Sequence, residues 1–294
     1  MCGCAATIQV VVDTGVIYSA AMNDLVNDPL FQSAALPFVV SLVVALILRP
    51  HGWVWAGLAA IAGFAATVYL LTGFEFFPLR SDRKILLLGA GAVVVGLVFD
   101  LLPWRRVAPG VLFVAAAAAA LWLVWPRFRF IEGWHLWALA IAGPLYVGWM
   151  VASCETLRQQ SLQADSVVFA LAMGTSISAL LGATALYGQL GGGIAAAVGA
   201  RLLLHLLNRP VAAGSIMLVP LVTVCALLGL GAVVYARLPW YILLVLALIP
   251  LMIRVPLPAS MPRWLLTVLT GLVALVPAGL AIFLTWRETG APPI

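Results

Sequence analysis

Charged residues are scarce in this 294-residue chain, which has 15 Lys and Arg and 10 Asp and Glu. Only 9% of its residues are charged and 65% are hydrophobic, whereas a soluble globular protein is roughly 25% charged and about half apolar. So few ionisable groups cannot cover the surface of a soluble protein of this length. The composition excludes an ordinary soluble enzyme, a disordered protein and a nucleic-acid-binding protein, and it predicts a multi-pass membrane protein.

The chain also lacks a polar stretch long enough to form a soluble domain. A bilayer core of ~30 Å requires about 20 apolar residues per helix, and spans of somewhat different length are tolerated. Short connections rich in Arg, Pro and Trp separate the apolar segments, as is typical of the membrane interfaces. The sequence predicts an all-α bundle of ten transmembrane helices, over residues 30–49, 53–73, 84–102, 107–126, 134–153, 166–187, 190–207, 214–235, 239–254 and 263–286.

Sequence clusters of metal-ligating or catalytic residues are missing as well. The four cysteines show no metal-type spacing, and His51, His135 and His205 are each isolated. The sequence has no P-loop, no nucleophile elbow and no aspartate-rich motif. We therefore expect a protein that is not an enzyme and that carries neither a cofactor nor a metal ion.

Two short internal similarities share one offset of 136 residues. Residues 52–63 (GWVWAGLAAIAG) align with 188–199 (GQLGGGIAAAVG), and residues 99–104 (FDLLPW) align with 235–240 (YARLPW). The same offset carries the start of the first span onto the start of the sixth, which indicates a duplication. Because five is an odd number of helices, the second copy enters the membrane from the opposite side, as in an inverted repeat.

This duplication divides the chain into five parts. The first is an N-terminal extension in which Met22 is an alternative start. Two five-helix membrane repeats follow, joined by a polar linker that we expect to be solvated, and a short tail ends the chain. The five parts cover residues 1–29, 30–153, 154–165, 166–286 and 287–294.

Small and weakly polar residues recur at steps of three and four from the predicted sixth span onward. They are Thr175, Ser178, Gly182, Ala185 and Gln189. On a continuous helix this spacing places them on one face. The face is either the wall of a substrate path or a packing seam, because small residues and hydroxyls let membrane helices approach closely.

Ionisable residues at membrane depth are functional candidates by default. Arg201 and His205 lie four residues apart near the end of the seventh span, where Arg201 could bind an anion and His205 could exchange protons. Alternatively, the Arg201 side chain extends to the lipid headgroups. Asp100 ends the third span just before two arginines, either as a proton relay or as an interfacial carboxylate.

In helix number and symmetry, the predicted architecture resembles the drug/metabolite transporter superfamily. The predicted fourth and ninth spans depart from that family's pattern because neither contains a carboxylate. We expect a small-molecule transporter or exporter with its path between the two inverted repeats. The candidate path or coupling residues are Arg201, His205, Asp100, Thr175, Ser178 and Gln189.

Two other functions are consistent with the sequence. One is a non-catalytic scaffold or accessory subunit of a larger membrane complex, which the scarcity of ionisable groups favours. The other is a membrane enzyme for lipid-borne substrates, which would depend on Arg201, His205 and Asn208. The expected partners are membrane lipids, an unknown small molecule, other membrane subunits or further copies of the chain, and no nucleic acid. A single Lys among the basic residues, with abundant Ala and Gly, suggests a prokaryotic inner membrane.

Overall fold

The computed structural model describes residues 28–51, 53–74, 77–102, 106–130, 133–182, 184–236, 238–255 and 261–289. Throughout these residues the chain forms helices and their connections, without a strand. Met22 and most of the predicted N-terminal extension, together with the end of the tail, lie outside the described residues.

Nine helices in the described part of the chain are long and apolar enough to cross a membrane. The first combines a π-helical turn, η1 (Phe31–Ala35), with α2 (Leu36–Leu48). The other eight are α3 (Trp53–Thr72), α4 (Ser81–Leu101), α5 (Ala108–Val124, extended by η3, Trp125–Phe130), α6 (Trp134–Glu155), α7 (Ser161–Gly182), α8 (Ala185–Leu206), α9 (Ser215–Ala236) and α12 (Arg263–Thr289). This is the architecture of a multi-pass helical membrane protein.

The predicted ninth span is divided into two short helices, α10 (Tyr241–Leu246) and α11 (Ile249–Met252). Pro250 has no N–H to donate to the carbonyl of Leu246, so a continuous helix is interrupted there. At 1.5 Å per residue, Tyr241–Met252 is about 18 Å long, less than the ~30 Å of a bilayer core. The described residues therefore contain nine helices long enough to span a membrane, and a tenth membrane span remains a prediction.

The boundary between the predicted sixth and seventh spans is wrong by about five residues. α7 ends at Gly182, and α8 already begins at Ala185. Thr184 has an extended backbone, and its side-chain oxygen accepts a hydrogen bond from the Tyr187 N–H at 3.4 Å, as an N-cap residue does. A local cap thus starts a new helix inside a segment that hydropathy assigns to one span.

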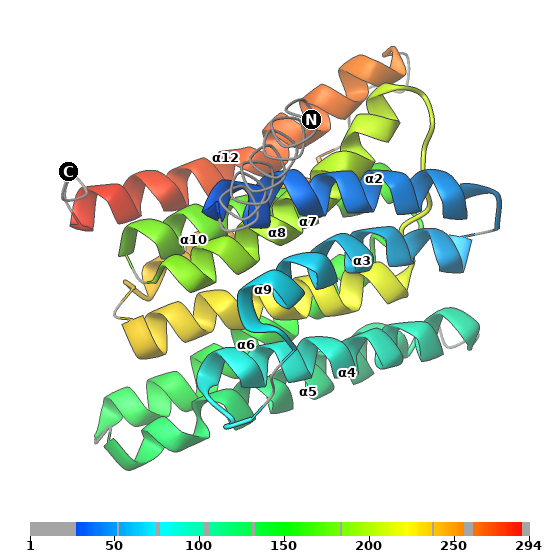
Figure 1. The fold of residues 1–294 in the computed structure, drawn as a ribbon. Coiled ribbons are helices and arrows are strands. Elements are labelled where there is room, and N and C mark those ends of the chain that lie inside the picture. The colour runs from blue at the N-terminus through cyan, green and yellow to red at the C-terminus, as the bar shows by residue number, and fades with distance from the viewer. Residues whose placement is uncertain are drawn as a thin grey trace, which may run out of the picture.

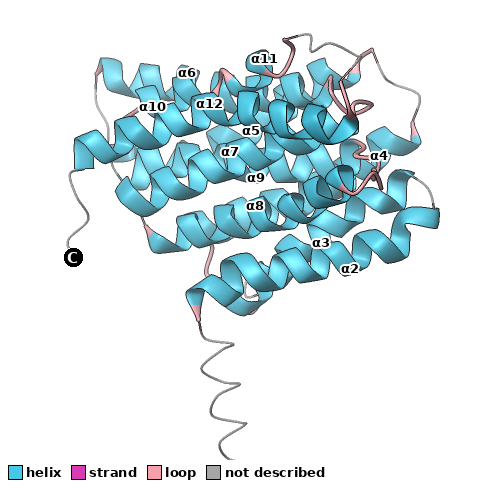
Figure 2. Cartoon of the chain, turned by 90° about the horizontal axis from the view of Figure 1, so that it is seen from above, coloured by secondary structure: helices cyan, strands magenta, loops and turns pink. Residues whose placement is uncertain are grey.

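α9 is the central helix of the bundle. Every residue from Ser215 to Ala232 is buried, and the helix packs against α3, α4, α5, α6, α7 and α8. Figure 1 shows α9 in the middle, with α12 on one side and α4 and α5 on the other. Seen from above, the long helices lie side by side with their axes in roughly one direction (Figure 2).

α4 lies antiparallel against α9. A Cβ atom on Gly96 would lie 2.5 Å from the Ser215 carbonyl oxygen, and one on Gly89 would lie 2.5 Å from Val224. These glycines let the two backbones approach closely, as small residues do between membrane helices. The contact brings the end of α4 to the beginning of α9.

The outer helices bury a narrow stripe and expose the rest of their apolar surface. In α2 the buried residues are Pro37, Ser41 and Ala45, four apart, while Val39 and Val43 are about half exposed. α12 exposes Leu272 and Val276 in the same way. An apolar outer surface of this kind is expected where lipid tails surround a protein.

The two predicted repeats do not make equivalent contacts throughout. α2 packs on α3 much as α7 packs on α8. However, α12, the last long helix of the second half, packs mainly along α7, whereas α6, the last helix of the first half, packs mainly along α5 and α9. The inverted repeat therefore remains a prediction.

Candidate functional site

A network of buried charged side chains lies at one end of the bundle, which we call the polar end. It is formed by the last residues of α4, α6 and α8 and the first residues of α3, α7 and α9. All the ionisable candidates from the sequence, Arg201, His205 and Asp100, lie there.

Arg201 of α8 is fully buried, so the alternative that its side chain extends to the headgroups is wrong. Its Nε donates to Asp165 Oδ1 at 2.9 Å, and its Nη1 donates to the Ala56 carbonyl at 2.9 Å. Its Nη2 donates to the carbonyls of Val211 at 3.3 Å and Ala212 at 2.9 Å. A guanidinium has five N–H donors, and these four bonds connect α8 to α7, α3 and the α8–α9 loop.

Asp165 of α7 accepts from two partners on α8. Its Oδ1 pairs with Arg201, and its Oδ2 lies 3.0 Å from His205 Nε2. Both Asp165 and Arg201 are fully buried, and His205 is 7% exposed. A buried charge requires a hydrogen-bonded partner of opposite charge. Arg201 and Asp165 each provide that partner for the other.

Asp100 of α4 caps the N-terminus of α9. Its two carboxylate oxygens accept the backbone N–H groups of Ser215 and Ile216, each at 2.8 Å. The first N–H groups of a helix have no partner within the helix, and a negative charge there is favourable. Asp100 is only 8% exposed, so it is a tertiary cap rather than an interfacial carboxylate.

Glu155 lies beside this cap. Its Oε1 accepts from the Ser215 hydroxyl at 2.6 Å and from Arg158 Nη1 at 3.1 Å, while its Oε2 is buried without a hydrogen-bond partner. Glu155 and Asp165 are 3% and 0% exposed, so the expectation of a solvated linker over residues 154–165 is wrong for both. The sequence carries no signal for the burial of these two acids, because Arg201 and Ser215 are distant from them in the sequence and only the fold brings these partners together.

The candidate face of the sixth span is divided between two helices. Thr175 and Ser178 are on α7, whereas Gln189 is on α8, so the five residues do not form one helix face. Thr175 and Ser178 are buried, and their hydroxyl oxygens have no partner. Gln189 is half-buried.

Part of that face is a close contact between α7 and α12. Ser178 lies midway between Gly174 and Gly182 at steps of four, and a Cβ on Gly174 would lie 3.0 Å from the Ala278 Cβ. A Cβ on Gly182 would lie 3.2 Å from the Thr285 methyl carbon. This geometry is that of a packing seam.

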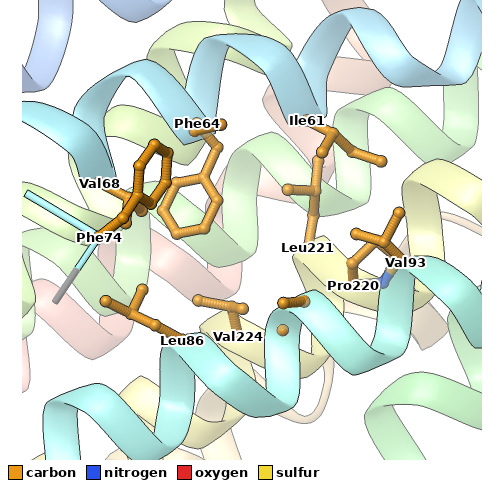
Figure 3. Close-up of a pocket in the computed structure, with 12 residues that line it drawn as sticks. Ile61, Phe64, Val68, Phe74, Leu86, Val93, Pro220, Leu221 and Val224 are labelled. Carbon is orange, nitrogen blue, oxygen red and sulfur yellow. The ribbon is translucent and has the colours of Figure 1, made fainter. Parts of the chain in front are cut away.

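An apolar pocket lies between α3, α4 and α9, three of the helices long enough to span a membrane. Its volume is about 160 Å³. Side chains from the three helices converge on it (Figure 3), and its twelve lining residues are Ile61, Phe64, Ala65, Val68, Phe74, Leu86, Gly89, Ala90, Val93, Pro220, Leu221 and Val224. We call it the α3–α4 pocket. Sequence reasoning did not find it, because no residue in it has a chemical signature.

Phe74 lies at one end of the α3–α4 pocket, in the turn that follows α3. It has a φ of 56°, which is uncommon for a residue other than glycine. Its ring centroid is 5.5 Å from that of Tyr69. The turn thus holds an aromatic ring where the pocket meets the end of α3.

A second apolar groove, of about 230 Å³, lies on the other side of α4. It separates α4 from α5, and α9 and α6 form its floor. Its lining residues are Leu87, Leu88, Gly91, Ala92, Val95, Leu112, Ala115, Ala116, Ala119, Val151, Val219 and Thr223. We call it the α4–α5 groove.

Among the residues that the structure describes, no group of three or more His, Cys, Asp and Glu could hold a metal ion. No protein-family model matches the chain, and no curated protein matches it significantly. The charge network and the two apolar spaces beside α4 are therefore the features of the described residues that bear on function.

Proposed function

We propose that the protein is a non-enzymatic small-molecule transporter or exporter of a prokaryotic inner membrane, and that its cargo binds in the α3–α4 pocket. One observation supports this most. The pocket lies between three predicted membrane spans and is shared between α3 and α4 of the first predicted repeat and α9 of the second. Transporters with repeats bind their cargo near the bilayer midplane where the repeats meet.

The pocket limits the chemistry of the cargo. Its lining is built almost wholly from hydrocarbon side chains, so the bound part of the cargo is apolar. A cavity of ~150 Å³ lined by apolar residues binds benzene, and the α3–α4 pocket is of similar size. We therefore propose a cargo with one ring or a short alkyl group, either uncharged or with a single charge that stays outside the pocket.

The charge network has a supporting role in this proposal. Arg201 already donates four hydrogen bonds to protein acceptors, so it has little capacity left for an anionic cargo. Asp100 is likewise occupied by the first N–H groups of α9. These residues instead hold α3, α4 and α9, the helices around the pocket, together at the polar end.

Flux in proteoliposomes tests this proposal. Benzoate and benzyltrimethylammonium are suitable probes, because each joins one ring to a single charge. We expect the protein to raise the flux of at least one probe above that of protein-free liposomes. Ala65→Leu, which fills the pocket, should abolish this flux, and Ala118→Leu, on the exposed face of α5, should retain it. Equal flux in wild type and Ala65→Leu would overturn the assignment of the pocket.

A scaffold or accessory subunit is the second candidate. Every residue of α9 from Ser215 to Ala232 is buried, and α2 and α12 have broad exposed apolar surfaces on which a partner could pack. Both observations favour the scaffold. Membrane cross-linking followed by native purification tests it. A stoichiometric membrane partner, together with no flux of either probe, would favour the scaffold over the transporter.

A further inference from the structure

The α4–α5 groove differs from the helix contacts around it. Its walls carry Gly91 and Ala92 on α4 and Ala115 and Ala119 on α5, residues that ordinarily let membrane helices pack closely. Yet a Cβ on Gly91 would meet no atom within 4 Å. The small residues here leave space between the helices.

A cation and an aromatic ring lie together at one end of this groove. Lys84 precedes Leu87 and Leu88 by three and four residues and therefore lies on the same face of α4. Its Nζ lies 5.0 Å from the ring centroid of Trp122 on α5, three residues beyond Ala119. The pair joins α4 to α5 across the groove, at the end of the bundle opposite the polar end.

A second cation lies close to the same end of α5. Arg127 of η3 is held 5.2 Å from the ring centroid of Tyr235, and the Tyr235 hydroxyl donates to the Leu123 carbonyl, next to Trp122. The Nε of Arg127 is buried without a hydrogen-bond partner.

Asp82, the acidic residue nearest to Lys84 in the sequence, lies on a different face of α4 from Lys84. Asp82 precedes Leu86, which lines the α3–α4 pocket, by four residues. It therefore lies on the side of α4 that faces this pocket. Among the described residues, Lys84 and Arg127 therefore place positive charge at this end of the α4–α5 groove, whereas the groove itself is apolar.

We propose that the α4–α5 groove binds an anionic phospholipid of the surrounding leaflet, with one acyl chain along Gly91 and Ala119 and its phosphate beside Lys84. An apolar groove with a cation at its mouth complements a molecule that joins a hydrocarbon chain to a negative headgroup. The groove lies on the opposite face of α4 from the α3–α4 pocket, so this site is independent of the proposed transport function.

Native mass spectrometry of the detergent-purified protein tests the site. The protein is given equal amounts of phosphatidylglycerol and phosphatidylcholine with the same acyl chains. We expect preferential retention of one phosphatidylglycerol. Lys84→Gln should lower the ratio of anionic to zwitterionic lipid by about fivefold, the effect expected of one basic residue near a membrane surface, and Lys84→Arg should preserve it.

Two further variants separate this site from general basic attraction. Gly91→Leu fills the groove without a clash at its Cβ position, so it should remove the tightly retained lipid while the protein stays monodisperse. Arg287→Gln, beside Trp286 at the same end of the bundle on α12, should leave retention unchanged. Wild-type lipid preference in Lys84→Gln or in Gly91→Leu would overturn the proposal. Retention of added palmitate in place of phospholipid would overturn it as well.

Discussion

Arg201 and Asp165 form an ion pair of 2.9 Å between α8 and α7, although they are 36 residues apart and neither side chain is exposed. The same guanidinium also binds three backbone carbonyls, of Ala56, Val211 and Ala212. The pair therefore anchors α7 and α8, the start of α3 and the loop that leads into α9. This pairing explains how Arg201, the largest fully buried side chain among the described residues, can lie inside an apolar bundle.

Removing one partner of this pair should destabilise the protein strongly. Arg201→Met leaves the Asp165 carboxylate buried without its cation, which typically costs about 3–5 kcal/mol. We expect a large fall in the thermal unfolding temperature in detergent, measured by the loss of the monodisperse species. Arg209→Met, at an exposed position after α8, is the matched control and should change little.

The double variant Arg201→Met with Asp165→Leu should be more stable than Arg201→Met alone, because no unpaired charge remains inside. A stable, monodisperse Arg201→Met protein would contradict the structural role of Arg201.

The cap on α9 should depend on both oxygens of Asp100. Asp100→Ala leaves the N–H groups of Ser215 and Ile216 buried without acceptors, at a cost of about 1–3 kcal/mol. Asp100→Asn retains one acceptor oxygen and should lose less. Thermal unfolding measures both variants, and Asp82→Ala, in the first turn of α4, should stay within about 1 kcal/mol of wild type. Equal stability of Asp100→Ala and wild type would argue against the cap.

Two glycines of α4 should respond differently to the same substitution. The Cβ of Gly96→Ala would lie 2.5 Å from the Ser215 carbonyl oxygen, and backbone cannot move aside easily, so we expect a loss of about 1–3 kcal/mol. Gly91→Ala meets open space and should be neutral or stabilising by up to about 1 kcal/mol, because Ala favours a helix. The comparison needs only the two unfolding temperatures, and a reversed order would show that α4 packs differently on α9.

Ser178 distinguishes a packing seam from a polar wall of a substrate path. Its hydroxyl is buried without a partner, so Ser178→Ala removes an unsatisfied group and should be neutral or slightly stabilising. We also expect unchanged flux of benzoate and benzyltrimethylammonium in proteoliposomes. A selective loss of flux in a stable Ser178→Ala protein would instead assign the hydroxyl to the path.

Much of the helical architecture could be predicted from the sequence, and the errors have local causes. Most predicted spans coincide closely with observed helices because an apolar run in lipid must satisfy its own backbone groups. Hydropathy alone misplaces the boundary at Gly182, because Thr184 caps a new helix without a change in hydropathy. The predicted ninth span was divided because Pro250 interrupts it.

The candidate site could be predicted only in part. The ionisable residues Arg201, His205 and Asp100 stand out because such residues are rare inside apolar segments. The sequence pattern places Asp165 and Glu155 in a solvated linker, because their burial depends on partners on other helices. The two apolar spaces beside α4 have no sequence signal at all, because apolar residues line a pocket and a packed interface alike.

The sequence by itself determined the class of this protein. With 9% of its residues charged, the chain can be covered only by lipid along most of its surface, and each apolar run can satisfy its backbone locally as a helix. Tertiary structure alone decided that α9 is the centre, which side chains neutralise Arg201, and that α4 has an apolar space on each side. The physical reason is the distance along the sequence between interacting residues. Helix formation depends on neighbours within a few residues, whereas charge pairing and packing depend on residues that only the fold brings together.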